Sequence, residues 1–115
     1  MTGWPPPPPV VPEVDVDQLD AARAEGVPVI DVRQPEEYDA GHVPGARLIP
    51  LSEVAMRVGE VPADGPVYVI CQSGQRSARA TDFLRRQGFD AHSVAGGTKA
   101  WVESGRAVTR GSQPG

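Results

Sequence analysis

The residue best placed to do chemistry in this chain is its single cysteine, Cys71. It follows the apolar run VYVI at 67–70, which is typical of a buried strand, and it opens the polar loop CQSGQR at 71–76. A helical pattern comes next. The amino end of a helix presents unpaired N–H groups and the positive end of the helix dipole, and both lower the pKa of a thiol placed there. The position therefore predicts a nucleophilic thiolate rather than a buried structural cysteine.

The loop after Cys71 is predicted to bind an anion. Because only four residues separate Cys71 from Arg76, the loop must curl with its amide N–H groups inward, and Gly74 can take the positive φ that such a curl needs. Arg76 adds a forked cation that suits a sulfonate, sulfate or phosphate, and Ser77 is expected to cap the helix. The residues predicted to contact the substrate are Gln72, Ser73, Gly74, Gln75, Arg76 and Ser77.

Three segments of the chain resemble signatures of the rhodanese family, the sulfurtransferases and their relatives. The first is DVRQPEEY at 31–38, continuing through GHVPGA at 41–46 to IPL at 49–51. The second is the loop CQSGQRS at 71–77, and the third is GF at 88–89, followed by VAGG at 94–97 and AW at 100–101. Leu48 departs from the pattern, because many relatives carry a polar residue there, and we expect a local packing change around it.

This resemblance implies a thiosulfate-type sulfurtransferase. Cys71 would attack the outer sulfur of thiosulfate or of a persulfide donor, become a persulfide itself, and pass the sulfur to a thiophilic acceptor in a second step. Since the chain has no second cysteine, the acceptor must be external: cyanide, a thiol or a sulfur-carrier protein. The resemblance implies neither a cofactor nor a metal ion.

The neutral loop residues lead to a hypothesis about the donor. Gln72, Ser73 and Gln75 carry no charge, so the attraction for a dianion falls on Arg76 and the backbone. We therefore expect weak binding of thiosulfate and better use of a less charged persulfide.

Two other functions remain open. One is a non-catalytic sulfur-carrier or regulatory module, whose proline-rich tail would recruit a partner. The other is a phosphatase or arsenate reductase, because related folds use a cysteine and an arginine around tetrahedral oxyanions. Those relatives place five residues between the two, and the four residues here form a ring that is too small for a phosphoryl group.

Several residues outside the loop have both a structural and a functional interpretation. Asp31 and Arg33 are predicted to support the site; Arg33 could touch the substrate, but an ion pair with a nearby carboxylate is favoured. His42, in a turn rich in glycine and proline, is expected to be a hydrogen-bonded structural residue rather than a general base. Trp101 is expected in the core. Arg79 could add positive charge near the loop or be solvated.

Composition limits the classes of partner and compartment. The chain has 115 residues, of which 39% are hydrophobic and 23% charged, a net charge of −4 and a pI near 5.0. The acidic balance argues against a nucleic-acid partner. One free cysteine fits a reducing compartment, so the cytoplasm is expected. No apolar run in the sequence is long enough to predict a signal peptide or a membrane span.

The predicted organisation is one α/β domain at 13–106 between a disordered proline-rich tail at 1–12 and a flexible tail at 107–115. Strands are expected at 27–32, 47–49, 67–70 and 91–94, and helices at 17–25, 35–40, 52–58, 77–87 and 98–103. Their alternation predicts a rhodanese-like fold, a mostly parallel sheet with helices on both faces, in which ligands bind at the carboxyl ends of the strands.

Overall fold

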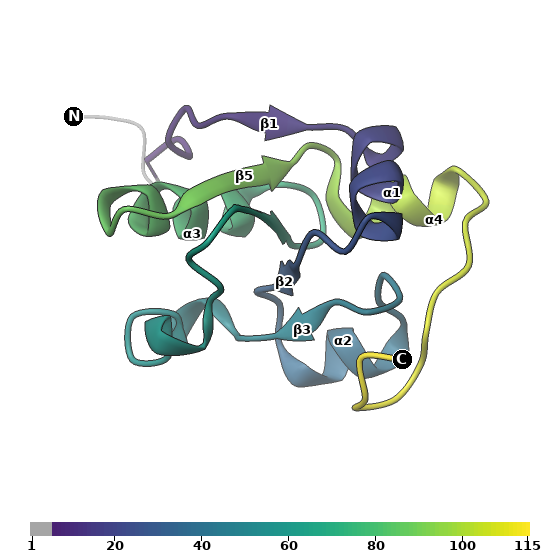
Figure 1. The fold of residues 1–115 in the computed structure, drawn as a ribbon. Coiled ribbons are helices and arrows are strands. Elements are labelled where there is room, and N and C mark those ends of the chain that lie inside the picture. Colours follow the sequence, from purple (N-terminus) through teal and green to yellow (C-terminus); the bar gives the residue numbers. More distant parts are fainter. Residues whose placement is uncertain (1–5) are drawn as a thin grey trace.

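A single parallel sheet forms the centre of the molecule (Figure 1). A computed structural model describes residues 6–115; Trp4 and Pro5, at the start of the predicted proline-rich tail, lie outside the described residues. The strand order is β1-β5-β4-β2-β3, and every pairing is parallel. The predicted α/β class and parallel sheet are thus confirmed. The strands are β1 (Glu13–Val14), β2 (Val29–Asp31), β3 (Arg47–Leu48), β4 (Pro66–Ile70) and β5 (Asp90–Val94).

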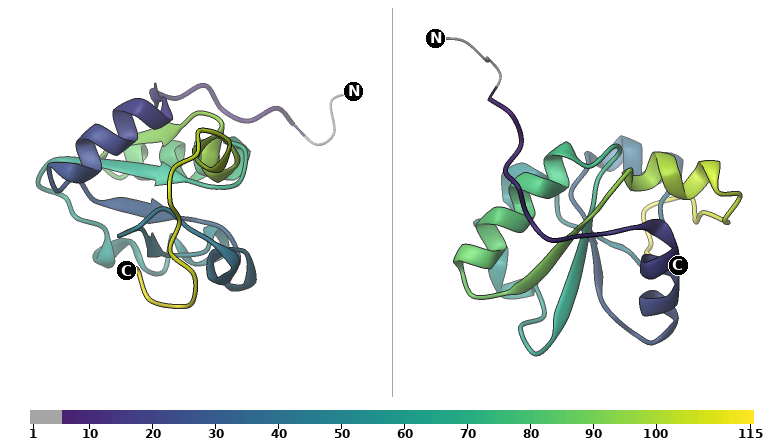
Figure 2. Two further views of the ribbon diagram at one scale, coloured as in Figure 1. Left: turned by 90° about the vertical axis from the view of Figure 1, so that its right-hand side faces the viewer. Right: turned by 90° about the horizontal axis from the view of Figure 1, so that it is seen from above.

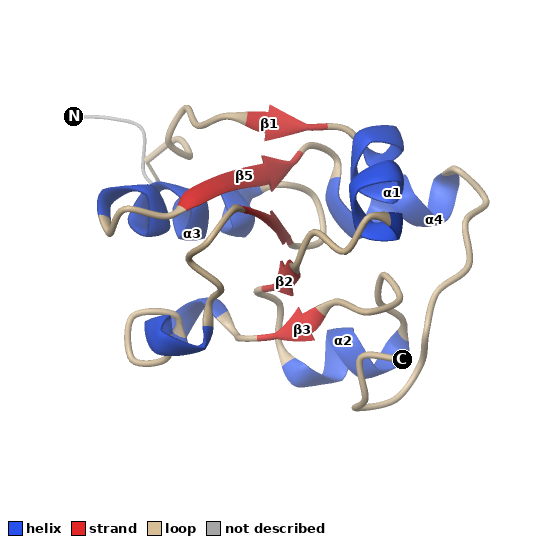
Figure 3. Ribbon diagram, in the orientation of Figure 1, coloured by secondary structure: helices blue, strands red, loops and turns tan. Residues whose placement is uncertain are grey.

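Helices cover both faces of this sheet, as Figures 2 and 3 show. The α-helices are α1 (Val16–Ala24), α2 (Pro35–Ala40), α3 (Gln75–Arg86) and α4 (Gly97–Glu103). Side chains alternate along β4: Val67 and Val69 join the core under α3, and Tyr68 and Ile70 join the core that contains Trp101 of α4. Within the described part of the chain, no helix is long and apolar enough to cross a bilayer.

The predicted α-helix at 52–58 is wrong. This region forms two 3₁₀ helices, η1 (Leu51–Glu53) and η2 (Val58–Glu60), joined by turns. Its apolar residues, Val54 and Val61 among them, pack against the core under α3, so tertiary contacts rather than helix propensity set the backbone. Gly59 and Pro62 also oppose a longer helix.

Other differences concern the ends of elements. No pattern in the sequence predicts β1, because two residues are too few to show a period, yet Glu13 and Val14 pair with Ser93 and Val94 of β5. Helix α1 begins at Val16 rather than at 17, and Asp15 caps it by accepting a hydrogen bond from the Gln18 N–H. The predicted helix at 77–87 begins two residues earlier, at Gln75.

The C-terminal segment after α4 returns along the molecule to α2 (Figure 1, yellow). The sequence predicts a flexible tail at 107–115. In the structure, His42 and Thr109 exchange two backbone hydrogen bonds of 2.9 Å each, and the N–H of Gly111 donates to the carbonyl of Asp39 at 2.9 Å. These bonds hold residues 109–111 beside the end of α2.

Candidate active site

Cys71 lies at the carboxyl end of β4, in the middle of the sheet. Its side chain is 1% exposed, so the sulfur sits inside the loop rather than on the surface. The N–H of Gly74 donates to Sγ at 3.1 Å, and the Ser77 Oγ lies 3.5 Å from Sγ. The predicted curl of the loop around the cysteine is therefore present, with Gly74 at a φ of 110°.

The cradle around Sγ favours the thiolate. Burial by itself raises the pKa of the Cys71 thiol, but hydrogen bonds from the Ser77 hydroxyl and from the backbone of Ser77, Gly74 and Ser73 outweigh it. The net result is a pKa below the ordinary value for cysteine. The loop can thus supply a nucleophile at a lower pH than an exposed cysteine would.

Ser77 has a different role from the predicted helix cap. Gly74 occupies the cap position of α3, and Ser77 lies inside the first turn. Its Oγ donates to the carbonyl of Gly74 at 3.2 Å and lies 2.8 Å from the Oγ of Ser93 on β5. Because the Ser77 Oγ lies 3.5 Å from Sγ, the hydroxyl can turn to donate to a thiolate. Ser93 was not predicted as a site residue, because no local pattern connects it with the loop.

The start of α4 holds the backbone of the loop. The N–H and the Oγ1 of Thr98 both donate to the carbonyl of Cys71, at 2.8 and 3.0 Å, and the N–H of Lys99 donates to the carbonyl of Gln72 at 3.1 Å. Gly97 packs against this backbone so closely that a Cβ there would lie 2.6 Å from the carbonyl oxygens of Cys71 and Gln72. A glycine is required at this contact.

Arg76 is already paired. Its guanidinium donates to both carboxylate oxygens of Glu37 on α2, at 2.7 and 2.8 Å. This pair, more than any other contact, lowers the pKa of Glu37 to about 2. Substrate binding by Arg76 stays a prediction, and the carboxylate beside it weakens the positive field that a dianion would feel.

Asp31 and Arg33 form a buried ion pair, as the favoured interpretation of Arg33 predicted. The guanidinium reaches both Asp31 oxygens at 2.9–3.1 Å, with side chains 3% and 0% exposed. Arg33 also donates to the Gln72 Oε1 at 3.2 Å and to the carbonyl of Gly41 at 2.9 Å. It therefore joins the active-site loop to the end of α2.

The other loop residues face outward. Ser73 and Gln75 are exposed, and Gln72 is half-buried against Arg33. Their contact with a substrate stays a prediction. Arg79, one turn further along α3, donates to the carbonyl of Pro6 at 2.9 Å.

His42 and Trp101 are structural, as the sequence predicts. The His42 ring is fully buried, stacks on Tyr38 at 3.6 Å and lies 2.8 Å from the Tyr38 carbonyl and 3.0 Å from that of Gln113. Trp101 is 1% exposed, and its indole N–H donates to the carbonyl of Ala107. Among residues 6–115, no group of three histidine, cysteine or carboxylate side chains could hold a metal ion.

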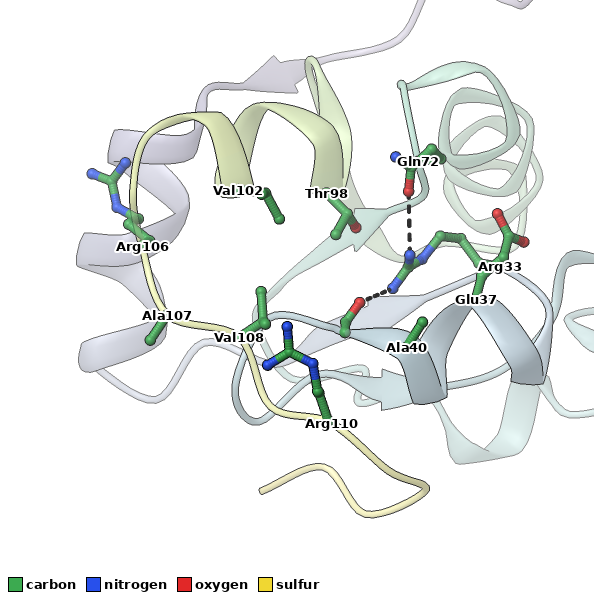
Figure 4. Close-up of a pocket in the computed structure, with 11 residues that line it drawn as sticks. Arg33, Glu37, Ala40, Gln72, Thr98, Val102, Arg106, Ala107, Val108 and Arg110 are labelled. Carbon is green, nitrogen blue, oxygen red and sulfur yellow. Dashed lines mark hydrogen bonds between the residues drawn. The ribbon is translucent and has the colours of Figure 1, made fainter.

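A pocket of about 540 Å³ opens beside the loop (Figure 4). It lies between the end of α2, the loop at Gln72, helix α4 and the C-terminal segment. No pattern in the sequence predicts this pocket, because its walls come from separate parts of the chain. The lining residues are Arg33, Glu37, Ala40, Gly41, Gln72, Thr98, Val102, Arg106, Ala107, Val108 and Arg110.

Comparison with known proteins agrees with this geometry. The family model for the rhodanese-like domain matches residues 15–104. Thiosulfate sulfurtransferase GlpE of Pseudomonas entomophila is 37% identical over 76% of this chain and 82% of its own length. Two Bacillus subtilis proteins also match: the uncharacterized protein YqhL at 46% identity over 64% of this chain, and the putative sulfur carrier protein YrkF at 39% over 68%. The chain spans 59% of YqhL and 43% of YrkF.

The solved structures that this fold matches include a rhodanese-related protein from Thermoplasma volcanium. It has a TM-score of 0.80 and 31% identity, and the match covers 86% of this chain and 98% of that one. The solved chain is therefore little longer than the part that matches.

Proposed function

Since the chain belongs to the rhodanese-like domain family, we propose that it is a sulfurtransferase that carries a sulfane sulfur as a persulfide on Cys71. The observation that carries this proposal is the sulfur cradle. Sγ of Cys71 accepts the N–H of Gly74 at 3.1 Å and has the Ser77 hydroxyl at 3.5 Å, and its pKa lies below the ordinary value. A thiolate enclosed by hydrogen-bond donors can attack a sulfur atom. The same donors can then stabilise the negative charge of the persulfide that results.

In the first half-reaction, the Cys71 thiolate attacks the outer sulfur of the donor. A new S–S bond forms to Sγ, and the donor's own S–S bond breaks with its electron pair on the leaving group. With thiosulfate the leaving group is sulfite, and the charge is conserved. The amide of Gly74 is placed to stabilise negative charge on the bound sulfur.

In the second half-reaction, an external nucleophile takes the outer sulfur and Sγ leaves as a thiolate. Because Cys71 is the only cysteine, no resolving thiol exists within the chain, and the acceptor is cyanide in vitro or a thiol or sulfur-carrier protein in the cell. A reactive free thiol needs a reducing compartment, so the cytoplasm is the proposed location. Thiosulfate as a donor is supported by the similarity to the thiosulfate sulfurtransferase GlpE.

Intact-protein mass spectrometry after exposure to thiosulfate tests the proposal. The reduced wild type should gain one sulfur atom and lose it again on addition of cyanide, with thiocyanate released. Cys71→Ser, which keeps the size of the side chain but offers no thiolate, should gain none. A wild type that accepts sulfur from neither thiosulfate nor an organic persulfide would contradict the proposal.

A second candidate is a sulfur carrier that accepts sulfur but does not turn over. The similarity to the putative sulfur carrier protein YrkF favours it, and so does the pairing of Arg76 with Glu37, which reduces the charge available for an anionic donor. Rapid formation of the Cys71 persulfide, followed by slow discharge to every small acceptor and fast discharge to a partner protein, would identify a carrier. Multiple turnover with cyanide or a small thiol would identify the enzyme.

A further inference from the structure

We infer that Ser93 of β5 is a positioning residue for the sulfur cradle: its hydroxyl donates to the Ser77 Oγ and thereby leaves the Ser77 proton for the sulfur of Cys71. The inference rests on the proposed function, because it concerns the thiolate that would attack the sulfur donor. It adds a group from a second strand to a cradle that residues 71–77 otherwise form.

The sheet fixes Ser93 in place. Ser93 lies on β5, where it pairs with Val69 of the neighbouring strand β4 on one side and with Glu13 of β1 on the other. Its N–H donates to the carbonyl of Pro12 at 2.9 Å. Its side chain is fully buried, and its Oγ lies 2.8 Å from the Oγ of Ser77 on α3. Because strands flank it on both sides, this hydroxyl is a preorganised hydrogen-bond partner.

The number of protons and acceptors sets the direction of the bond between the two serines. Ser77 and Ser93 are both fully buried, so each hydroxyl proton needs an acceptor within the protein. The Ser77 Oγ has three neighbours that can accept: the Ser93 Oγ at 2.8 Å, the carbonyl of Gly74 at 3.2 Å and the Cys71 Sγ at 3.5 Å. Among residues 6–115, the Ser93 Oγ has only the Ser77 Oγ as a partner.

This difference makes Ser93 the donor. If Ser77 donated its proton to Ser93, the buried Ser93 proton would have no acceptor, which is unfavourable. If Ser93 donates to Ser77, both protons are satisfied, because the Ser77 proton can then go to the Gly74 carbonyl or to Sγ.

The same arrangement accounts for what changes when the thiol ionises. In the thiol state, the Cys71 S–H donates to the Ser77 Oγ, and Ser77 donates to the carbonyl of Gly74. When the thiol proton passes to water, the Ser77 hydroxyl turns and donates to Sγ. Its oxygen accepts from Ser93 in both states, since a hydroxyl oxygen has two lone pairs. A hydroxyl that accepts one hydrogen bond donates a stronger one, so Ser93 stabilises the thiolate through Ser77.

Thr81 supplies a matched control. It lies one turn after Ser77 on α3, and its side chain is also fully buried. Its Oγ1, however, has no hydrogen-bond partner in the part of the chain that the structure describes. Thr81→Val keeps the shape of the side chain, so it removes a buried hydroxyl without removing a hydrogen bond.

The pH dependence of Cys71 alkylation by iodoacetamide tests the inference. Ser93→Ala should raise the pKa of Cys71. At pH values below that pKa, the alkylation rate should then fall about threefold, as expected for the loss of one neutral hydrogen bond. The rate at high pH, where all of Cys71 is thiolate, should stay unchanged, and Thr81→Val should alter neither. A wild-type profile for Ser93→Ala, or an equal fall in rate at every pH, would overturn the inference.

A double-mutant cycle tests whether Ser93 acts through Ser77. In the Ser77→Ala background, Ser93→Ala should cause no further change in the pKa of Cys71, because the hydroxyl that transmits its effect is absent. The ultraviolet absorbance of the thiolate measures this pKa without a reagent, so access to the buried sulfur does not affect the result. Equal shifts with and without the Ser77 hydroxyl would contradict the inference.

These measurements use no sulfur donor, so they separate the inference from the proposed function. If Cys71 accepted sulfur while Ser93→Ala left its pKa unchanged, the inference would fail and the proposed function would stand. If the pKa moved as expected while the wild type accepted sulfur from neither thiosulfate nor an organic persulfide, the proposed function would fail. Ser93 would then still be the positioning residue of the thiolate.

Discussion

The two sides of the site around Cys71 are constructed differently. On the α3 side, the seven residues 71–77 enclose the sulfur, and its partners are backbone amides and one hydroxyl. On the α4 side, the pocket is walled by side chains from α2, the loop, α4 and the C-terminal segment, and it includes the exposed Val102 and Arg110. The cradle is contiguous and closed, while the pocket is assembled and open to solvent at its rim.

This difference separates the part of the site that holds the sulfur from the part that depends on individual side chains. Backbone donors fix the position of a sulfur atom and do not depend on which side chains surround them, so the cradle can serve any sulfane donor. The pocket depends on individual side chains, and these can change without disturbing the loop. The cradle is therefore expected to tolerate surface substitutions better than the pocket does.

Arg33 is the residue that joins the two sides, so its removal should have the largest effect. Arg33→Met leaves the Asp31 carboxylate buried without its partner and should cost about 3–5 kcal/mol of unfolding free energy. Arg47→Met is the control, since it breaks an ion pair with Glu60 whose side chains are 52% and 36% exposed, and should cost less than about 1 kcal/mol. Urea unfolding of both variants gives the comparison. Equal losses would show that the Asp31–Arg33 pair contributes no more than a surface one.

Gly97→Ala should damage the cradle from the α4 side. The new Cβ would lie 2.6 Å from the carbonyl oxygens of Cys71 and Gln72, so the loop must move. A displacement of this kind is expected to slow sulfur transfer about 100-fold. Gly26→Ala introduces a Cβ at a similarly positive φ but has no atom within 4 Å, and it should lower stability with no change in kcat. A transfer rate that fell equally in both would mean that backbone strain, rather than the contact with the loop, is responsible.

Ser77→Ala should change the cradle more gently. The hydroxyl of Ser77 lowers the pKa of Cys71, so its loss should raise that pKa and move the rise of the alkylation rate to higher pH. At pH values below the pKa of Cys71, where little thiolate forms, the alkylation rate should fall about tenfold. This is the factor expected from the loss of one hydrogen bond to a charged group. Iodoacetamide alkylation over a range of pH measures this. A profile that did not move would show that the backbone amides alone stabilise the thiolate.

Sequence reasoning located the contiguous side of the site and most of the sheet. The position of Cys71 at the end of a strand, the curl at Gly74 and the central strand β4 follow from local patterns, because a strand, a short polar loop and a helix succeed one another within the 21 residues 66–86. The sequence also favours an ion pair for Arg33, because the carboxylates of Asp31, Glu36 and Glu37 surround it, and the structure shows that Asp31 is the partner.

The assembled side could not be predicted in this way. Arg76 and Glu37 are 39 positions apart, and Ser77 and Ser93 are 16 apart, so only the order of the strands brings them together. The pocket depends likewise on the return of the C-terminal segment to α2. The 3₁₀ helices at 51–60 follow tertiary packing in place of local helix propensity.

The pair between Glu37 and Arg76 sets how much charge the cradle presents, and its removal should have the smallest effect on stability. Glu37→Gln keeps the shape of the side chain and frees the guanidinium of Arg76, so the KM for thiosulfate should fall a few-fold while that for the diethyl ester of glutathione persulfide stays within twofold.

The pH dependence of unfolding supplies the second measurement. Because the pKa of Glu37 is lowered to about 2 in the folded protein, its pair stabilises the fold above the ordinary carboxyl pKa and loses that contribution as the pH falls toward 2. Between the ordinary carboxyl pKa and pH 2, the wild type should therefore lose about 1 kcal/mol more of its unfolding free energy than Glu37→Gln does. The exposure of both side chains keeps this difference small. If thiosulfate were used no better by the variant, the charge of Arg76 would not reach the bound donor, and the neutral loop residues would account for donor choice without it.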